Sequence, residues 1–342
     1  MSSMASEVLG ILAKYSTPLP DQAQFGKQAT SQIIAHISAH QPIRLVLPAF
    51  PLKNPNPTKV LGPARPDLGE ELALERLERL CVEIEGVYEH GAQLCIVSDG
   101  LVYGDGLIDI DEGVDLMGVL DRDSFEYGQE LRALAAAKGC HHIEFLRVMD
   151  MLDPGKGSGG GDLAVDISAD AYLSAVPAMR ADLERLFLDR AFDVERELET
   201  NPDTQLTYSG FAKLVAQDMR WGRNFDHALL DDTHKHDQAV EKVARAMIRR
   251  LVAYENLLRD KFADSVRLSI HRSKKGDEKI YIPLLPREND TGMNPWNCCV
   301  ALLNNGEVRT GYSMDFVETY DLVRRDNRPY FFRDRIYPAV GE

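Results

Sequence analysis

Two lysines in a stiff polar loop are the first residues of the sequence that could do chemistry. Lys53 and Lys59 bound the stretch "KNPNPTK", which closely follows the apolar run "IRLVLPAF". Prolines at positions 55 and 57 restrict the backbone there and at the preceding residues, so less entropy is lost when the loop is fixed. Because a lysine ammonium binds phosphate as a point charge, we predict that this loop grips an anionic substrate. The alternative is a solvated, proline-rich turn.

A second polar loop, "SDGLVYGD", supplies carboxylates. Asp99 can hold a substrate amine, or act as a general base if it is partly buried. It can equally close the end of a strand by hydrogen-bonding its own backbone, and the sequence leaves both roles open. We take Asp99 and Asp105 as candidate proton carriers, and Ser98 as a candidate substrate contact.

The stretch "RLSIHRSKKGDEKI" places Arg267, Ser269 and His271 at alternate positions of an expected strand. Alternate residues share one face of a strand, so the three polar side chains are expected together. Arg267 suits a two-pronged grip on a carboxylate or phosphate, and His271 suits proton transfer. Lys279 on the following strand can join them. The alternative is an exposed polar face.

Other patterns favour structure over chemistry. In "PDLGEELAL", Asp67 and Glu70 form a capping-box pattern, which accounts for Glu70 structurally and leaves it a weaker candidate proton carrier. The paired histidines at 141–142 and in "HKH" lack carboxylate or cysteine neighbours at ligand spacing, so no metal is expected. The glycine-rich stretch at 154–162 comes late in the chain after a proline, so we interpret it as a loop rather than a dinucleotide site.

Apolar periodicity predicts the elements that position these residues. Helices are expected over 22–40, 68–90 and 124–138, and short apolar strands over 43–49, 93–97 and 142–148. Such alternation indicates a parallel sheet covered by helices, and ligands of these sheets bind outside the carboxyl ends of the strands. Both polar loops, 50–67 and 98–106, directly follow a strand. More helices are expected near 168–198, 207–219 and 236–263, before a strand-rich end with an "NNG" hairpin turn at 304–306.

Composition limits the partners. The net charge of −15 disfavours nucleic acid and anionic membranes, and no apolar run approaches the roughly 20 residues of a membrane span. The five cysteines are odd in number and scattered, apart from adjacent Cys298 and Cys299, whose side chains would face opposite ways on a strand. This usage is typical of a reducing cytoplasm. We expect a cytoplasmic protein that acts on small molecules.

Four stretches together resemble one protein family. "LVLPAFPLKNPNPTKVLGPARPDLGEELAL", "IVSDGLVYGD", "VRLSIH" and "NPWNCCVALL" are similar to the isonitrile (isocyanide) synthases, the pyoverdine and dityrosine biosynthesis proteins. The resemblance covers roughly residues 30–335. It implies a Rossmann-like α/β domain, assigned to residues 1–200. A helical segment and a strand-rich part over 201–342 would complete the active site.

The resemblance also implies an activity. Members condense the α-amino group of an L-amino acid, often tyrosine or tryptophan, with ribulose 5-phosphate, whose C2 becomes the isonitrile carbon. No metal or organic cofactor is implied, and the product would pass to a tailoring enzyme. Three alternatives stay open: N-formyl amino acid formation as in dityrosine spore-wall synthesis, another phosphosugar lyase or isomerase, and a silent binding protein.

In that chemistry Lys53 and Lys59 would hold the phosphate, and Arg267 either the phosphate or the carboxylate. Trp296 and Asn297 are further candidate substrate contacts. Asn297 is a departure, because the family usually has histidine after Pro-Trp. Asparagine forms hydrogen bonds but does not shuttle a proton near neutral pH, so the chain would use a different amino acid, depend on His271 or have an altered activity.

Overall fold

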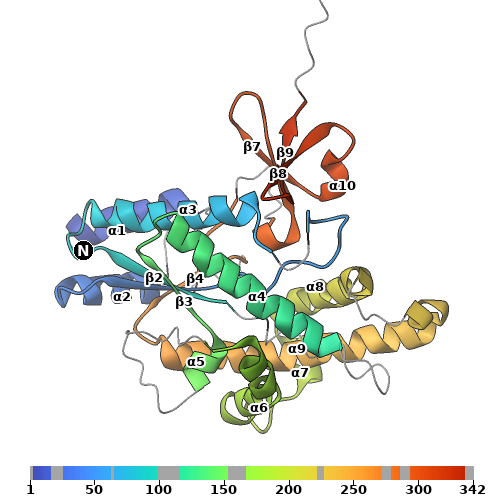
Figure 1. Ribbon diagram of the computed structural model, residues 1–342. Helices are drawn as coiled ribbons and strands as arrows, with labels where there is room; N and C mark the ends of the chain where they lie inside the picture. The colour runs from blue at the N-terminus through green and yellow to red at the C-terminus, as the bar shows by residue number, and fades with distance from the viewer. Residues whose placement is uncertain are drawn as a thin grey trace, which may run out of the picture.

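A five-stranded parallel sheet forms the centre of the computed structural model (Figure 1). The structure describes residues 3–16, 26–62, 65–98, 100, 116–152, 167–221, 227–271, 279–285 and 293–335. Its strand order is β3-β2-β1-β4-β5, and every neighbouring pair is parallel. The strands are β1 (Ile43–Pro48), β2 (Ala92–Val97), β3 (Ile143–Leu146), β4 (Val266–Ser269) and β5 (Ile280–Tyr281).

Helices cover both faces of this sheet because its strands bury alternate residues on opposite sides. On β1, Ile43, Leu45 and Leu47 enter one core, whereas Val46 enters the other. The first core is closed by α1 (Ser3–Tyr15), α2 (Lys27–Ser38), α3 (Leu68–Glu85) and α4 (Leu116–Ala137). The second is closed by α5 (Val148–Leu152), α6 (Ala169–Phe187) and α9 (Thr233–Lys261). The predicted α/β class is confirmed.

Two further helices lie between α6 and α9 in the chain. They are α7 (Val194–Thr200) and α8 (Pro202–Asp218), followed by the 3-10 turns η3 (Met219–Trp221) and η4 (His227–Asp231). α8 packs against α9 through Val215, Val243 and Met247, and Leu52 of the loop after β1 joins that contact. The loop and α8 are therefore in contact.

A second, smaller sheet follows the 3-10 turn η5 (Pro295–Asn297). Its order is β7-β6-β9-β8, and it lies next to the N-terminal end of α3 (Figure 1). It consists of β6 (Cys299–Leu302), β7 (Val308–Gly311), β8 (Tyr320–Arg325) and β9 (Arg328–Asp334), with α10 (Ser313–Phe316) between β7 and β8. This sheet contains the later strands of the strand-rich end expected from the sequence.

Several expected details of this region are confirmed, and one feature was missed. The "NNG" turn joins antiparallel β6 and β7 with Gly306 at φ 85°, and Cys298 and Cys299 enter different cores. The β8–β9 hairpin was not expected; its turn has Asp326 and Asn327 at φ 50° and 61°, which these residue types tolerate.

The strand-rich part belongs to two sheets. β4 and β5 lie beyond residue 200 yet extend the central parallel sheet, so this sheet crosses the division expected at that residue. The glycine-rich stretch at 154–162 lies outside the described residues. No helix among the described ranges is both long and apolar enough to cross a bilayer.

We expect Gly100→Ala to destabilise the protein, because α4 approaches the end of β2 at this glycine. An added Cβ would lie 1.9 Å from Ser124 Oγ and 3.0 Å from the carbonyl oxygen of Pro51. Ser124 Oγ donates to that carbonyl at 2.8 Å, so it cannot move away freely. The free energy of unfolding, measured by urea denaturation, should fall by about 1–3 kcal/mol.

Gly210→Ala is the matched control. Gly210 lies in α8 with nothing within 4 Å of an added Cβ, so alanine there should leave stability unchanged or raise it by up to about 1 kcal/mol. Equal effects of the two substitutions would contradict the close approach at Gly100.

Candidate active site

The polar loop after β1 is a buried, internally bonded structure. Asn54 Oδ1 accepts from the backbone N–H of Asn56 at 2.8 Å, and Asn56 Oδ1 accepts from that of Thr58 at 2.9 Å. These successive side-chain turns, together with the two prolines, fix the loop. Both asparagines are nearly inaccessible to solvent. The alternative of a solvated turn is therefore wrong for this loop.

Asp218, the last residue of α8, is the main hydrogen-bonding partner of this loop. Its carboxylate accepts from Asn54 Nδ2 at 2.9 Å and from Asn56 Nδ2 at 3.0 Å, and it pairs with Lys59 Nζ at 2.7 Å. Asp218 is buried. The sequence analysis missed it, because nothing near the end of α8 marks it by motif or spacing. We call Asn54, Asn56, Lys59, Asp218 and Asn297 the Asp218 cluster.

Lys59 keeps part of its side chain at the surface. Its ammonium pairs with Asp218 and lies 5.5 Å from the ring centre of Tyr312. Its side chain is 16% exposed, whereas that of Lys53 is fully buried. Lys59 is therefore the lysine of the pair that can reach a ligand while Asp218 holds it in place.

Lys53 faces inward and its hydrogen-bonding capacity is used. Its ammonium donates to Asp67 Oδ2 at 2.8 Å, to Glu70 Oε2 at 2.8 Å and to the carbonyl oxygen of Pro295 at 3.0 Å. An ammonium has three N–H groups, so this arrangement leaves none for a phosphate. Lys53 therefore has no donor left for a phosphate, contrary to the role expected from the sequence.

The Lys53 contacts extend into a buried network. The capping box expected at α3 is present: Gly69 N–H donates to Asp67 Oδ1, and Glu70 Oε2 accepts from the backbone N–H of Asp67, each at 2.8 Å. Tyr127 of α4 donates to Glu70 Oε1 at 2.9 Å. We call Lys53, Asp67, Glu70 and Tyr127 the Lys53 network. Glu70 is thus a buried structural partner, with no solvent-facing surface.

One cation faces two buried carboxylates in this network. Burial alone would lower the pKa of Lys53, but attraction by Asp67 and Glu70 holds that pKa above its usual range. Burial, aided by repulsion from Glu70 and opposed by Lys53, raises the pKa of Asp67 to about 7. Lys53 stays charged, and Asp67 holds a proton through much of the acid range. Asp67 is thus a proton-holding group that the sequence indicated only as a helix cap.

A second charged cluster joins β4 to α9. Glu255 of α9 accepts from Arg267 Nη2 at 3.1 Å and from Lys279 Nζ at 2.9 Å. Burial would raise the pKa of Glu255, but the charges of Arg267 and Lys279 lower it to about 2. Two cations thus share one carboxylate, and Arg267 Nη1 is buried without a hydrogen-bond partner in the described chain. The arrangement leaves positive charge for an anion.

His271 follows the end of β4 and lies near Lys279 and Glu255, within the charged cluster that also holds Arg267. β4 ends at Ser269, whose Oγ donates to the carbonyl oxygen of His271 at 2.8 Å and accepts from its N–H at 3.1 Å. The chain bends there, and His271 keeps some solvent exposure. Desolvation and the charge of Lys279 lower the pKa of His271, and Glu255 opposes this shift. The strand thus ends before His271, but the expected grouping of His271 with Lys279 is present.

The remaining expected residues connect the loop to its neighbours. Ser98 Oγ donates to the carbonyl oxygen of Phe50 at 2.7 Å. Trp296 packs edge-on against Phe50 with ring centres 5.1 Å apart, and Asn297 Oδ1 accepts from Asn54 Nδ2 at 3.1 Å. The residue that departs from the family pattern thus joins the Asp218 cluster.

Two expected proton carriers, Asp99 and Asp105, lie outside the described residues. Within the described ranges, no group of three or more histidine, cysteine, aspartate or glutamate side chains is arranged to hold a metal ion.

Comparison with known proteins decides the family. The model of the family described as "Pyoverdine/dityrosine biosynthesis protein" matches residues 33–323. The chain belongs to this family. The resemblance read from the four sequence stretches is thereby confirmed.

Relatives of this pyoverdine/dityrosine biosynthesis family member occur in fungi and bacteria. Isocyanide synthase xanB of Aspergillus fumigatus is 34% identical, over 97% of this chain and 42% of its own length. An L-tyrosine isonitrile synthase of Xenorhabdus nematophila is 28% identical, over 89% of this chain and 84% of its own. The chain thus spans less than half of the fungal relative.

A solved structure agrees with the fold. The crystal structure of PvcA from Pseudomonas aeruginosa superposes with a TM-score of 0.77 at 25% sequence identity, covering 97% of this chain and 100% of PvcA. The α/β architecture with its smaller C-terminal sheet is therefore the architecture of a known family member.

We expect stability to depend on pH through Asp67. Its pKa is about 7 in the folded protein against a usual value of 3.8, so between these values the folded state binds a proton that the unfolded state has lost. The free energy of unfolding from this group therefore falls as the pH rises from about 4 to about 7. Asp67→Asn removes this titration. The free energy of unfolding of the variant, relative to that of the wild type, should therefore rise across that pH range.

Urea denaturation at a series of pH values measures this difference. Asp260→Asn, on the exposed surface of α9, is the matched control and should follow the wild-type curve. A constant free-energy difference between Asp67→Asn and wild type from pH 4 to 7 would contradict the assignment.

Proposed function

We propose that this chain is an isonitrile synthase that joins the α-amino group of an L-amino acid to C2 of ribulose 5-phosphate. The observation that carries the proposal is the family match over residues 33–323. Relatives that match nearly the whole chain or most of it are named isocyanide or L-tyrosine isonitrile synthases. An aromatic L-amino acid is therefore the first acceptor to test.

The chemistry asks for groups of the kind that this chain carries. Amine and ketone form an imine with loss of water, and the imine then accepts electrons from bonds beside it. The protein must hold two anionic substrates, move protons and exclude water. Ionisable side chains can perform the first two of these tasks.

For the anionic groups we propose Lys59 and the pair Arg267 and Lys279. Lys59 is partly exposed and held by Asp218, and Arg267 has a buried Nη1 with no partner in the described chain. Charged donors of this kind form strong hydrogen bonds to carboxylate and phosphate oxygens. Ser98, Trp296 and Asn297 are proposed to contact substrate around them.

For proton transfer the proposal keeps Asp99, Asp105 and His271, and adds Asp67. Its pKa near 7 suits a group that gives and takes protons at neutral pH. Asn297 cannot do this, and its side chain is hydrogen-bonded to Asn54. The N-formyl amino acid, which is the isonitrile plus one water, therefore remains an alternative product, and Asn297 itself favours only the alternative of a silent binding protein.

Labelled substrate tests the proposal. The chain is incubated with ribulose 5-phosphate carrying ¹³C at C2 and with a panel of L-amino acids, and the products are analysed by mass spectrometry. We expect one amino acid to gain a single labelled carbon on its nitrogen as the isonitrile. The N-formyl product would be heavier by one water and would replace the isonitrile assignment.

Two other outcomes would contradict amino-acid chemistry altogether. Turnover of the sugar phosphate without amino acid would indicate another phosphosugar enzyme, and no turnover with any amino acid would indicate a binding protein.

Lys59→Met should raise the KM for ribulose 5-phosphate about tenfold or more, because the substrate loses a charge-assisted hydrogen bond. Lys261→Met, at the end of α9, is the matched control and should leave KM unchanged.

A further inference from the structure

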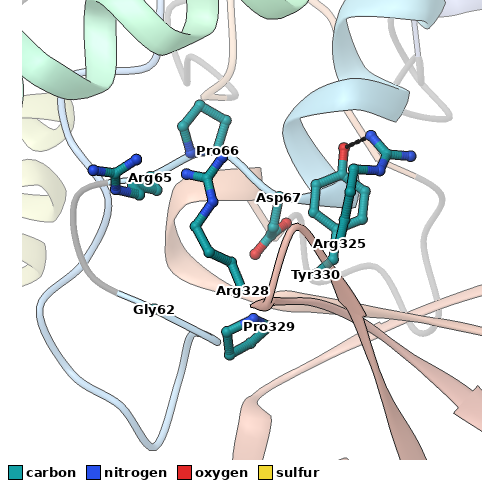
Figure 2. A pocket seen from close by; sticks show the side chains of 8 residues that line it. All are labelled: Gly62, Arg65, Pro66, Asp67, Arg325, Arg328, Pro329 and Tyr330. Atoms are coloured by element: carbon teal, nitrogen blue, oxygen red, sulfur yellow. Dashed lines mark hydrogen bonds between the residues drawn. The ribbon is translucent and has the colours of Figure 1, made fainter.

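An arginine-lined pocket lies between the β8–β9 hairpin and the segment that leads into α3. Its volume is about 200 Å³, and Figure 2 shows Arg65, Arg325 and Arg328 around it with the carboxyl group of Asp67 between them. An engineered cavity of about 150 Å³ binds benzene, so this pocket has room for a small molecule or its charged end. Asp67, proposed above for proton transfer, lines this pocket, but its three arginines have no role in the proposed function.

Each arginine uses only part of its guanidinium group on protein partners. Arg65 and Arg328 both bind Glu130 of α4 through Nη1, the latter at 2.9 Å. Arg325 Nη1 donates to Glu71 and to the hydroxyl of Tyr330, each at 2.7 Å. Within the described ranges the Nε and Nη2 groups of all three make no hydrogen bond. These donors remain for a ligand, because a guanidinium carries five N–H groups.

The protein holds these side chains in place before any ligand arrives. Arg325 stacks on Tyr330 with 3.9 Å between its guanidinium carbon and the ring centre. Tyr330 and Lys138 both bind Glu71, the carboxylate that also fixes Arg325. Glu130 holds the other two arginines from a second helix. Because these side chains are already ordered in the free protein, they lose less conformational entropy on binding. A preorganised group of cations therefore binds anions more tightly.

The local charge is opposite to that of the whole molecule. The chain carries a net charge of −15, yet three arginines line this pocket against one carboxyl group, that of Asp67. Asp67 pairs with Lys53 through Oδ2 and accepts from the N–H of Gly69 through Oδ1, so its carboxyl group is already partnered within the protein. Glu71 and Glu130 are each bound to two cations. Lys138 also pairs with Glu75, so the excess positive charge is that of Arg65 and Arg328, which share Glu130, and an anion would meet this excess.

We propose that this pocket binds a small molecule through a carboxylate or phosphate group, gripped by Arg325 on one side and by Arg65 and Arg328 on the other. The planar guanidinium fork matches both oxyanions in two-pronged geometry. In the described chain, no hydrogen bond or ion pair joins the three arginines to the Asp218 cluster or to Glu255. The site is thus additional to those residues, and its binding does not depend on the proposed reaction.

Calorimetric titration of the full chain tests the site. The probes are inorganic phosphate, L-tyrosine and ribulose 5-phosphate, each titrated separately. We expect at least one to bind, and its Kd to rise about tenfold or more in Arg328→Gln and again in Arg65→Gln, since each loses a charge-assisted hydrogen bond. Binding of inorganic phosphate assigns a phosphate ligand, and binding of L-tyrosine alone a carboxylate.

Arg324→Gln is the matched control, because Arg324 lies on the same hairpin and donates to the carbonyl oxygen of Asn327 instead of lining the pocket. Its Kd should stay within about twofold of the wild type. Absence of binding for all three probes, or equal affinities in the Arg328, Arg65 and Arg324 variants, would overturn the proposal. The readout is binding, so a chain without isonitrile activity would still decide it.

Discussion

The structure depends on one buried ammonium group, that of Lys53, shared between two carboxylates and a carbonyl oxygen. Its hydrogen bonds to these three groups join the loop after β1 to the start of α3 and to the turn before the C-terminal sheet. Tyr127 adds α4 to the same contact through Glu70. Removing a buried charge's only counter-charge costs about 3–5 kcal/mol, more than a surface ion pair contributes. The relative placement of these four segments is therefore tied to the charge balance at one point.

This arrangement separates structural cations from cations that remain for ligands. All N–H donors of Lys53 are used within the protein. In contrast, Lys59, Arg267 and the pocket arginines retain N–H donors for a ligand. In each of these cases a protein carboxylate holds the cation without using all of its hydrogens. Such carboxylates, Asp218, Glu255 and Glu130, come from the helices α8, α9 and α4. Carboxylates on helices thus orient the cations that strands and loops carry, and these cations keep donors for an anionic ligand.

Much of the fold could be predicted from the sequence because apolar periodicity and turn residues are local signals. The strands near residues 43 and 93, the capping box at Asp67 and Glu70, and the turn at Gly306 follow from spacing alone. The site was harder, since residue type does not reveal whether a charged side chain points inward. Lys53 and Lys59 lie in one short motif, yet only their distant partners, Glu70 and Asp218, distinguish their burial. Asp218 itself carries no local signal at all.

A thermodynamic cycle on the buried ammonium tests the central claim most directly. The free energy of unfolding is measured by urea denaturation for wild type, Lys53→Met, Asp67→Asn with Glu70→Gln, and all three substitutions combined. We predict that Lys53→Met alone costs about 3–5 kcal/mol, because it leaves uncompensated buried charge. The combined variant should cost less than the sum of its parts by about 1–3 kcal/mol. Costs that add to within about 0.5 kcal/mol would contradict the claim that this shared charge holds the structure together.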